Sequence, residues 1–212
     1  MHSLIGAVPD SWGHARLADL CGILAGPSGT RLRIEQRTSG NIPVITPQSL
    51  RNNRIAEDGD SAVSYEQARS LARYRVRPMD TVVVRTGALG RQGLASEDQD
   101  GWLLGSGCLR LRPGHPLDAR YLAYYLGHPS VRDWIIRNGV GSAIPTLTTK
   151  TLGALPVVVP PGETQAAIAE TLNAFDEKIT IHEQIAATTA ALRDAIIPTL
   201  FSPGPQMESA RR

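Results

Sequence analysis

Cysteine is scarce in this chain of 212 residues, and so are long apolar runs. The two cysteines, Cys21 and Cys108, are too few for a disulfide scaffold or a cysteine-based metal site, so we expect both to be buried as small apolar residues. The five histidines lack the spacing of metal ligands, so no metal ion is predicted. No run approaches the roughly 18 apolar residues of a membrane span, and the N-terminus is not typical of a signal peptide. The sequence therefore predicts a cytoplasmic protein that does not enter a membrane.

Several catalytic motifs are also missing. A DNA adenine methyltransferase would carry a polar residue before a proline pair and an aromatic residue after it, whereas "VPPG" at residues 159–162 has only the prolines. The glycines of "TGALGRQG" at residues 86–93 lack the spacing of a phosphate-binding loop and indicate a tight turn instead. "DEK" at residues 176–178 has no acidic residue on an upstream strand and is typical of a solvated helix face. We therefore predict a protein that is not an enzyme and needs no cofactor.

Lysine is almost absent, because twenty of the 22 basic residues are arginines. Residues 31–91 carry eleven arginines against six acidic residues, a local balance of +5. Residues 163–201 carry six acidic residues against Lys178 and Arg193. A genome rich in G and C could explain the arginine content, but it does not explain this segregation. The pattern favours a polyanion as the partner of the basic part and a protein as the partner of the acidic part.

Short β-branched runs at residues 41–47 and 80–87 are typical of buried strands, and residues 101–114 indicate a further strand or pair of strands. Between the first two, Ser64 and Gln67 form a capping-box pattern, which predicts a helix. Two short helices follow at 117–126 and 128–139, with Pro129 at a favoured start. A loop rich in glycine and threonine is expected at 139–156. These elements predict an α/β (α+β) domain with a mixed sheet over residues 1–160, and a disordered tail at 202–212.

The most periodic segment lies between the α/β domain and the tail, at residues 161–201, and predicts a long helix of coiled-coil type. Apolar residues at steps of three and four place a seam along one face, which then continues with a shift of phase. A helix over residues 163–197 would be about 50 Å long at ~1.5 Å per residue, so we expect half of it to project from the domain and to bind a partner. Folding back over the α/β domain is the alternative. The seam residues are Ile168, Leu172, Phe175, Ile179, Ile185 and Leu192.

Six segments together resemble the DNA specificity subunit of type I restriction and modification systems. They are "VPDSWGHARLADLC", "GNIPVITPQSL", "YRVRPMDTVVVRTGALGR", "YLAYYLGHPSVRDWI", "GSAIPTLTTKTLGALPVVVPPGETQAAIAETLNAFDEKI" and "TTAALRDAIIPTLF", in the expected order over about residues 8–201. In that family a target-recognition domain reads one half of a bipartite DNA site, and a long helix joins the methyltransferase subunits. The family more often has glutamate directly followed by glutamine, whereas here Thr164 separates Glu163 from Gln165. Full subunits carry two such domains and two such helices, so the chain resembles a half-subunit.

The resemblance implies double-stranded DNA and a methyltransferase subunit as partners. It implies a non-catalytic role, because adenine methylation would belong to the methyltransferase and cleavage to a third subunit. The helix seam would pair with that of a second half, either a copy of this chain or another half-subunit, and a homodimer of identical readers would prefer an inverted repeat.

Three groups of polar residues are candidates for contact with DNA. Arginine bonds guanine, asparagine and glutamine bond adenine, and all of them can bind phosphate, so the sequence does not separate the two roles. We favour Arg91 and Gln92 for base reading, because glycines at 90 and 93 would let the backbone approach a groove. The groups are Arg85, Thr86, Arg91 and Gln92 at a strand end; Thr38, Ser39, Asn41, Asn52, Asn53 and Arg54 around the first strand; and Thr146, Thr148, Thr149 and Lys150 in the threonine loop.

Two other functions stay open. The chain could be the recognition subunit of a stand-alone methyltransferase or of another DNA-modification system. It could also be a coiled-coil interaction protein without a DNA role.

Overall fold

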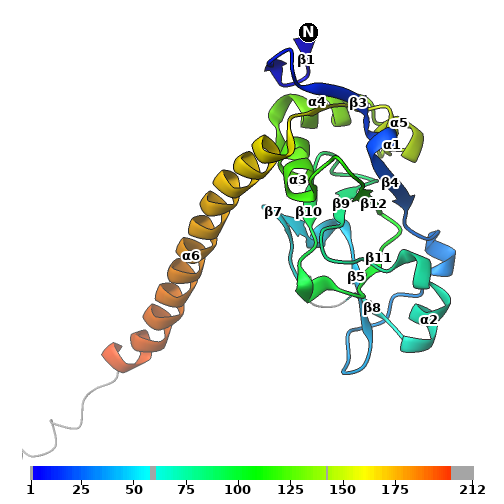
Figure 1. Cartoon of the computed structure of the whole chain (residues 1–212). Helices are drawn as coiled ribbons and strands as arrows, with labels where there is room; N and C mark the ends of the chain where they lie inside the picture. Colours follow the sequence, from blue (N-terminus) through cyan, green and yellow to red (C-terminus); the bar gives the residue numbers. More distant parts are fainter. Residues whose placement is uncertain (1, 58–60, 142, 202–212) are drawn as a thin grey trace, which may run out of the picture. The chain divides into compact units, whose positions relative to one another are not determined.

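The computed structural model describes residues 2–57, 61–141 and 143–201 (Figure 1). The chain forms two compact units, Met1–Glu170 and Thr171–Arg212. Sheets and short helices make up the first unit, and helix α6 (Gly162–Phe201) begins in it and continues through the described part of the second. The predicted α/β domain followed by a long helix is confirmed. The predicted tail at 202–212 lies outside the described residues.

A six-stranded mixed sheet forms the centre of the first unit. All of its neighbouring strands are antiparallel except β10 and β7, which run parallel. The four residues of its strand β9, Thr-Val-Val-Val, are all buried, as expected of a short β-branched run covered on both faces. The strand order is β4 (Cys21–Ala25), β12 (Cys108–Pro113), β9 (Thr81–Val84), β10 (Gln92–Leu94), β7 (Asn53–Ile55) and β6 (Leu50–Arg51).

Three smaller sheets complete the strands. The order in the three-stranded sheet is β11 (Leu103–Leu104), β5 (Ile42–Ile45) and β8 (Ala62–Val63). The two-stranded sheets pair β13 (Pro156–Val159) with β3 (Gly13–Arg16) and β1 (His2–Ser3) with β2 (Gly6–Ala7). Residues 101–114 thus contain two strands, β11 and β12, which belong to different sheets. Gly105 allows this crossing, because a Cβ there would lie 2.4 Å from the carbonyl oxygen of Ile45.

Short helices surround the sheets, and their ends follow the predicted signals. Ser64 caps α2 by accepting a hydrogen bond from the Gln67 backbone, and Pro129 occupies the first turn of α4. The predicted threonine loop is partly wrong, because the Thr148 hydroxyl accepts from the Thr151 backbone and so starts a helix, α5. The helices are α1 (Leu17–Leu20), α2 (Tyr65–Ser70), α3 (Ala119–Gly127), α4 (Pro129–Arg137) and α5 (Thr149–Gly153).

Both cysteines lie in the apolar core, as predicted. Burial raises the pKa of each thiol to about 12, and for Cys108 the nearby charge of Arg91 opposes this rise. The core also holds Leu109 and Leu111 of β12 and Leu122 and Leu126 of α3, all without exposed surface. Helix α3 therefore packs on the sheet through its leucines.

Gln165 anchors the first turns of α6 inside the first unit. Its side chain has no exposed surface. The amide oxygen accepts from the Asp118 backbone N–H at 2.8 Å, and the amide nitrogen donates to the carbonyl oxygens of Pro116 at 3.0 Å and Pro160 at 2.9 Å. One buried amide thus ties the start of α6 to the residues before α3 and to the end of β13.

We expect Gln165→Leu to lower the free energy of unfolding by about 2–3 kcal/mol, because it leaves buried N–H and C=O groups without partners at similar side-chain volume. Urea denaturation followed by circular dichroism measures this. Gln48→Leu changes an exposed glutamine and should leave the midpoint unchanged. Equal midpoints for both variants would contradict the anchoring role.

The second unit, through residue 201, is one continuous helical segment of α6. The whole helix has 40 residues, which corresponds to about 60 Å. Five of its predicted seam residues are exposed, with Leu172 at 38% and Phe175 at 59%; the others are Ile179, Ile185 and Leu192. Ile168 instead lies in the first unit and is partly buried against its core, so this part of the predicted seam is wrong. Within the described ranges, no helix is both long and apolar enough to cross a membrane.

Candidate nucleic-acid interface

A cavity of about 400 Å³ in the first unit brings several predicted residues together. Three segments far apart in the sequence form it: the β6–β7 turn, the residues before β10, and α4. Three of its lining side chains are guanidinium groups and three are amides. They are Leu50, Arg51, Asn52, Asn53, Gly90, Arg91, Gln92 and Arg132.

The β6–β7 turn supplies two of the amides. Arg51 pairs with Arg54 across the hairpin, so Asn52 and Asn53 form a two-residue turn between them. Their φ angles are +47° and +60°, a left-handed conformation that asparagine tolerates better than other residues with a Cβ. The sequence "RNNR" therefore places Asn52 and Asn53 at the wall of the cavity. Arg54, on the same hairpin, is exposed.

The loop after β9 supplies another part of the lining. The Val84 backbone donates to the Arg91 carbonyl oxygen at 2.9 Å, which closes a loop of six residues, 85–90, where the sequence predicted a tight turn. Gly90 has a φ of +82°, and a Cβ there would lie 3.5 Å from the Ile136 side chain and 3.7 Å from that of Arg132. The turn therefore lies against α4, which brings Arg132 to the cavity.

Two buried polar atoms at this cavity have no hydrogen-bond partner among the described residues. The Arg91 guanidinium donates to the carbonyl oxygen of Pro47 through one terminal nitrogen, but its Nε is unpaired. The Oδ1 atom of Asn53 is unpaired as well. The residues of the cavity thus include one unmatched donor and one unmatched acceptor, and both atoms are buried in the unbound chain.

Gln92 is directed toward α3. Its amide fits best with the nitrogen donating to the Gly90 carbonyl oxygen at 3.0 Å and the oxygen accepting from the Gly127 N–H at 3.1 Å. This amide therefore holds the turn against the end of α3. Its predicted base reading would require these hydrogen bonds to be given up.

Gly93 has a role within the fold that the sequence did not predict. A Cβ at this position would lie 2.6 Å from the Arg54 carbonyl oxygen, inside the parallel pair of β10 and β7. Glycine is needed here for close approach of two strands within the fold, and its predicted approach to a groove of DNA stays a prediction.

The other predicted residues lie around the turn or away from it. Arg85 and Thr86 pair with the segment before α5, because the Leu147 N–H donates to the Arg85 carbonyl oxygen at 2.7 Å and Thr86 bridges Thr146. Thr148, Thr149 and Lys150 are exposed at the start of α5. Asn41 lies at the opposite end of β5 from Pro47 and bonds within its own loop, next to the exposed Thr38 and Ser39.

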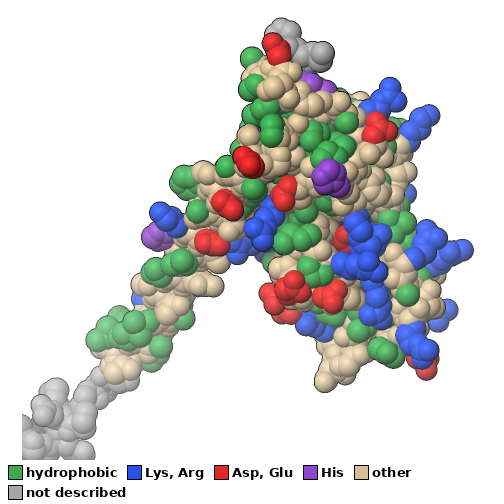
Figure 2. Space-filling view, in the orientation of Figure 1, with side chains coloured by type: hydrophobic (Ala, Val, Ile, Leu, Met, Phe, Trp, Pro, Cys, Tyr) green, Lys and Arg blue, Asp and Glu red, His purple; other side chains and the backbone are tan. Residues whose placement is uncertain are grey.

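Sequence reasoning missed Arg132 and did not single out Arg51. Arg132 and Ile136 stand four residues apart, which places them on one face of α4. Nothing in the sequence indicates that this face meets Gly90. Figure 2 shows how the Lys and Arg side chains gather on the first unit. No group of three or more His, Cys, Asp or Glu residues suited to a metal ion occurs in the part of the chain that the structure describes.

We expect Gly93→Ala to lower the free energy of unfolding by about 1–3 kcal/mol, because the added methyl group forces β10 away from β7. Thermal unfolding measures the loss. The matched control is Gly29→Ala, where a Cβ would meet no atom within 4 Å. If both variants melted like the wild type, the parallel pair would not depend on a glycine.

Comparison with known proteins gives a family match over most of the chain. The model of the type I restriction modification DNA specificity domain matches residues 9–188. The type I restriction enzyme MjaIX specificity subunit of Methanocaldococcus jannaschii is 26% identical over 178 residues, which are 82% of this chain and 40% of that protein.

Solved structures agree in fold. The S subunit of a type I system from M. genitalium superposes with a TM-score of 0.63 at 17% identity, over 94% of this chain and 48% of that one. The HsdS subunit from Thermoanaerobacter tengcongensis superposes with a TM-score of 0.54 at 19% identity, over 88% of this chain and 41% of that one. The chain therefore spans less than half the length of these relatives.

Proposed function

The chain belongs to the type I restriction modification DNA specificity family, and we propose that it selects the DNA sequence on which a partner methyltransferase acts. The observation that carries this proposal is the cavity between the β6–β7 turn and α4, which combines three guanidinium groups with three amides. Arginine donates to guanine, and asparagine both donates to and accepts from adenine, so this set of side chains suits the edges of bases.

Within the cavity, Arg91, Arg132 and Asn53 are the proposed base-reading residues. The buried Nε atom of Arg91 and Oδ1 atom of Asn53 have no partner among the described residues, and base edges would satisfy them once these side chains turn toward the cavity. Gln92 holds the wall on which they stand. Contacts to phosphate are proposed for the exposed or half-exposed residues nearby, namely Arg51, Asn52, Arg54, Arg85, Thr86, Thr148 and Lys150. Asn41 would contribute only where the DNA extends to the far end of β5.

The proposed division of labour leaves this chain without a catalytic step and without a cofactor. Methyl transfer to adenine belongs to the partner subunit, in the cytoplasm. The chain recognises double-stranded DNA and presents it to the methyltransferase, in a restriction complex or in a stand-alone modification system.

We further propose that the exposed seam of α6 pairs with the helix of a second half, either a copy of this chain or another half-subunit. The seam offers Leu172, Phe175 and Ile179 at helical spacing, all exposed. A pair of identical chains would read two inverted half-sites, and the helices would set the distance between them.

Mapping of methylated adenines in the host genome tests the recognition proposal. Deletion of the gene should abolish methylation at one bipartite sequence. Arg91→Ala and Arg132→Ala should each weaken binding to that site by about 1–3 kcal/mol and relax the target at single base positions, because bidentate contacts are lost. The control Arg120→Ala removes an exposed arginine of α3 and should keep the pattern. An unchanged map in the deletion strain would refute the proposed function.

Light scattering of the full chain tests the helix proposal. The double variant Leu172→Asp with Phe175→Asp should give a folded monomer, because two charges in the seam oppose its burial. Ala174→Asp adds one such charge away from the seam and should leave the assembly intact. A wild type that is monomeric and does not bind its methyltransferase would contradict this part of the proposal.

A further inference from the structure

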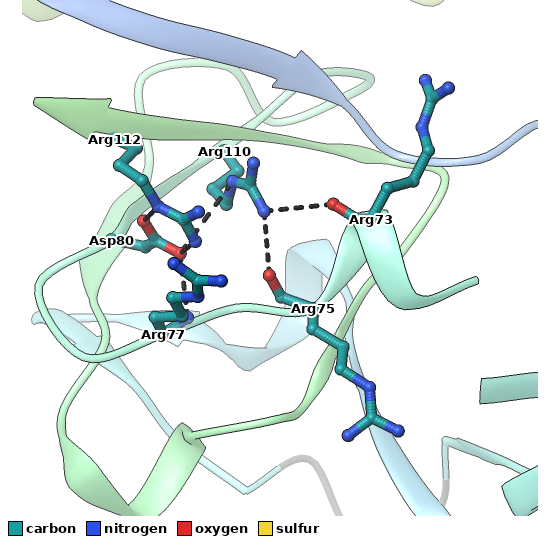
Figure 3. Close-up of polar contacts among 6 residues, drawn as sticks. All are labelled: Arg73, Arg75, Arg77, Asp80, Arg110 and Arg112. Carbon is teal, nitrogen blue, oxygen red and sulfur yellow. Dashed lines mark hydrogen bonds and ion pairs between the residues drawn. The ribbon is translucent and has the colours of Figure 1, made fainter. Parts of the chain in front are cut away.

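A second group of arginines surrounds a buried carboxylate at the start of β9 (Figure 3). The Asp80 side chain is only 1% exposed. Arg112 donates to both of its oxygens, at 2.7 and 2.6 Å, and the Arg77 backbone N–H donates to Oδ2 at 2.8 Å. We call this group the Asp80 cluster; it comprises Arg73, Arg75, Arg77, Asp80, Arg110 and Arg112.

Arg110 is held in the same network but is not neutralised by it. Its Nη1 donates to the carbonyl oxygens of Arg73 at 3.3 Å and Arg75 at 2.8 Å. Its Nε lies 3.9 Å from Asp80 Oδ2 and has no hydrogen-bond acceptor among the described residues. Burial lowers the pKa of Arg110, and the charges of Arg112 and Arg77 lower it further against the opposing effect of Asp80. Positive charge therefore dominates this site.

The outer arginines of the cluster add charge that Asp80 does not compensate. Arg73 and Arg75 contribute backbone carbonyl oxygens to the network, while their side chains point away from Asp80 (Figure 3). The Arg73 guanidinium lies over the Tyr74 ring, 4.7 Å from its centroid, which holds it in place. The five arginines with one carboxylate carry a net charge of +4.

The Asp80 cluster is separate from the cavity. Asp80 directly precedes β9, whereas the turn that carries Arg91 follows β9, so about 16 Å of extended chain lies between the two ends at ~3.3 Å per residue. Residues paired across neighbouring strands place their side chains on the same face of the sheet. Leu109, Val83 and Gln92 are paired in this way, so they share one face, whereas Arg110, which follows Leu109, lies on the other. Since Gln92 faces α3, Arg110 lies on the sheet face opposite α3.

We propose that the Asp80 cluster is a second DNA-contact site, which binds the phosphate backbone and reads no bases. This inference rests on the proposed function and adds a site to it. Guanidinium groups with unmatched donors bind phosphate oxygens well. A span of about 16 Å corresponds to about five base-pair steps along the axis of a duplex at ~3.4 Å each, which is within the length of one binding site.

The test uses the full chain and a 30-bp duplex of random sequence, because backbone contacts need no target site. The triple variant Arg73→Gln, Arg75→Gln and Arg77→Gln removes three charges but keeps the backbone groups that bond Arg110 and Asp80. Fluorescence anisotropy between 50 and 200 mM KCl gives the slope of log K against log salt. Each lost phosphate contact should reduce this slope by about 1, so we expect a reduction of about 2–3 and an affinity at least about tenfold lower at 100 mM.

The matched control removes three exposed arginines outside both groups, Arg16→Gln, Arg120→Gln and Arg193→Gln, and should keep a slope near that of the wild type. Both variants should unfold at the same temperature as the wild type, which establishes that their folding is intact. If the triple variant unfolds at a lower temperature, the salt slope of Arg73→Gln alone is compared with that of the wild type. Equal slopes for wild type and cluster variant, equal losses in the cluster variant and the control, or no binding by the wild type at 50 mM would each overturn the inference. An unchanged methylation map in the deletion strain, with the slope effect present, would defeat the proposed function and leave the cluster standing.

Discussion

Strand β9 is the constraint on which both arginine groups depend. It pairs with β12 on one side and β10 on the other, and all four of its residues are buried. Such a strand cannot shift by one residue without exchanging the faces of Val82 and Val83, so its register is strongly fixed. Asp80 stands at its start and the turn carrying Arg91 at its end. The core of the sheet thereby sets the separation of two surface sites.

The buried carboxylate of Asp80 organises charge that would otherwise repel itself. Arg112 bonds it in a bidentate manner, and this hydrogen bond raises the pKa of Arg112. Asp80 alone holds the hydrogen-bond network of the cluster together, and the charges of the other arginines are not compensated by a carboxylate within it. Removing Asp80 would leave the mostly buried side chain of Arg110 among like charges, a costly arrangement. The same surplus that makes the network dependent on Asp80 makes it suited to an external anion.

Local signals in the sequence predicted much of the fold. The β-branched runs became β5 and β9, the Ser64 cap and Pro129 mark helix starts, and the period of residues 161–201 gave α6. The cavity could not be predicted as a whole, because it needs the parallel pairing of β10 with β7 and the contact of Gly90 with α4. Both join residues about 40 positions apart. Arg132 was missed for this reason, and the cap formed by Thr148 was overlooked within a segment rich in loop-forming residues.

Helix α6 changes character along its length. In the first unit Gln165 and Ala169 are buried, and every polar atom of the Gln165 amide has a partner, so the helix start is fixed by satisfied hydrogen bonds. From Leu172 onward large apolar side chains are exposed at helical spacing. Burying a fully exposed Leu, Ile or Phe side chain yields about 1.5–3 kcal/mol, so covering this partly exposed seam by the helix that we propose as its partner would offset part of the cost of association.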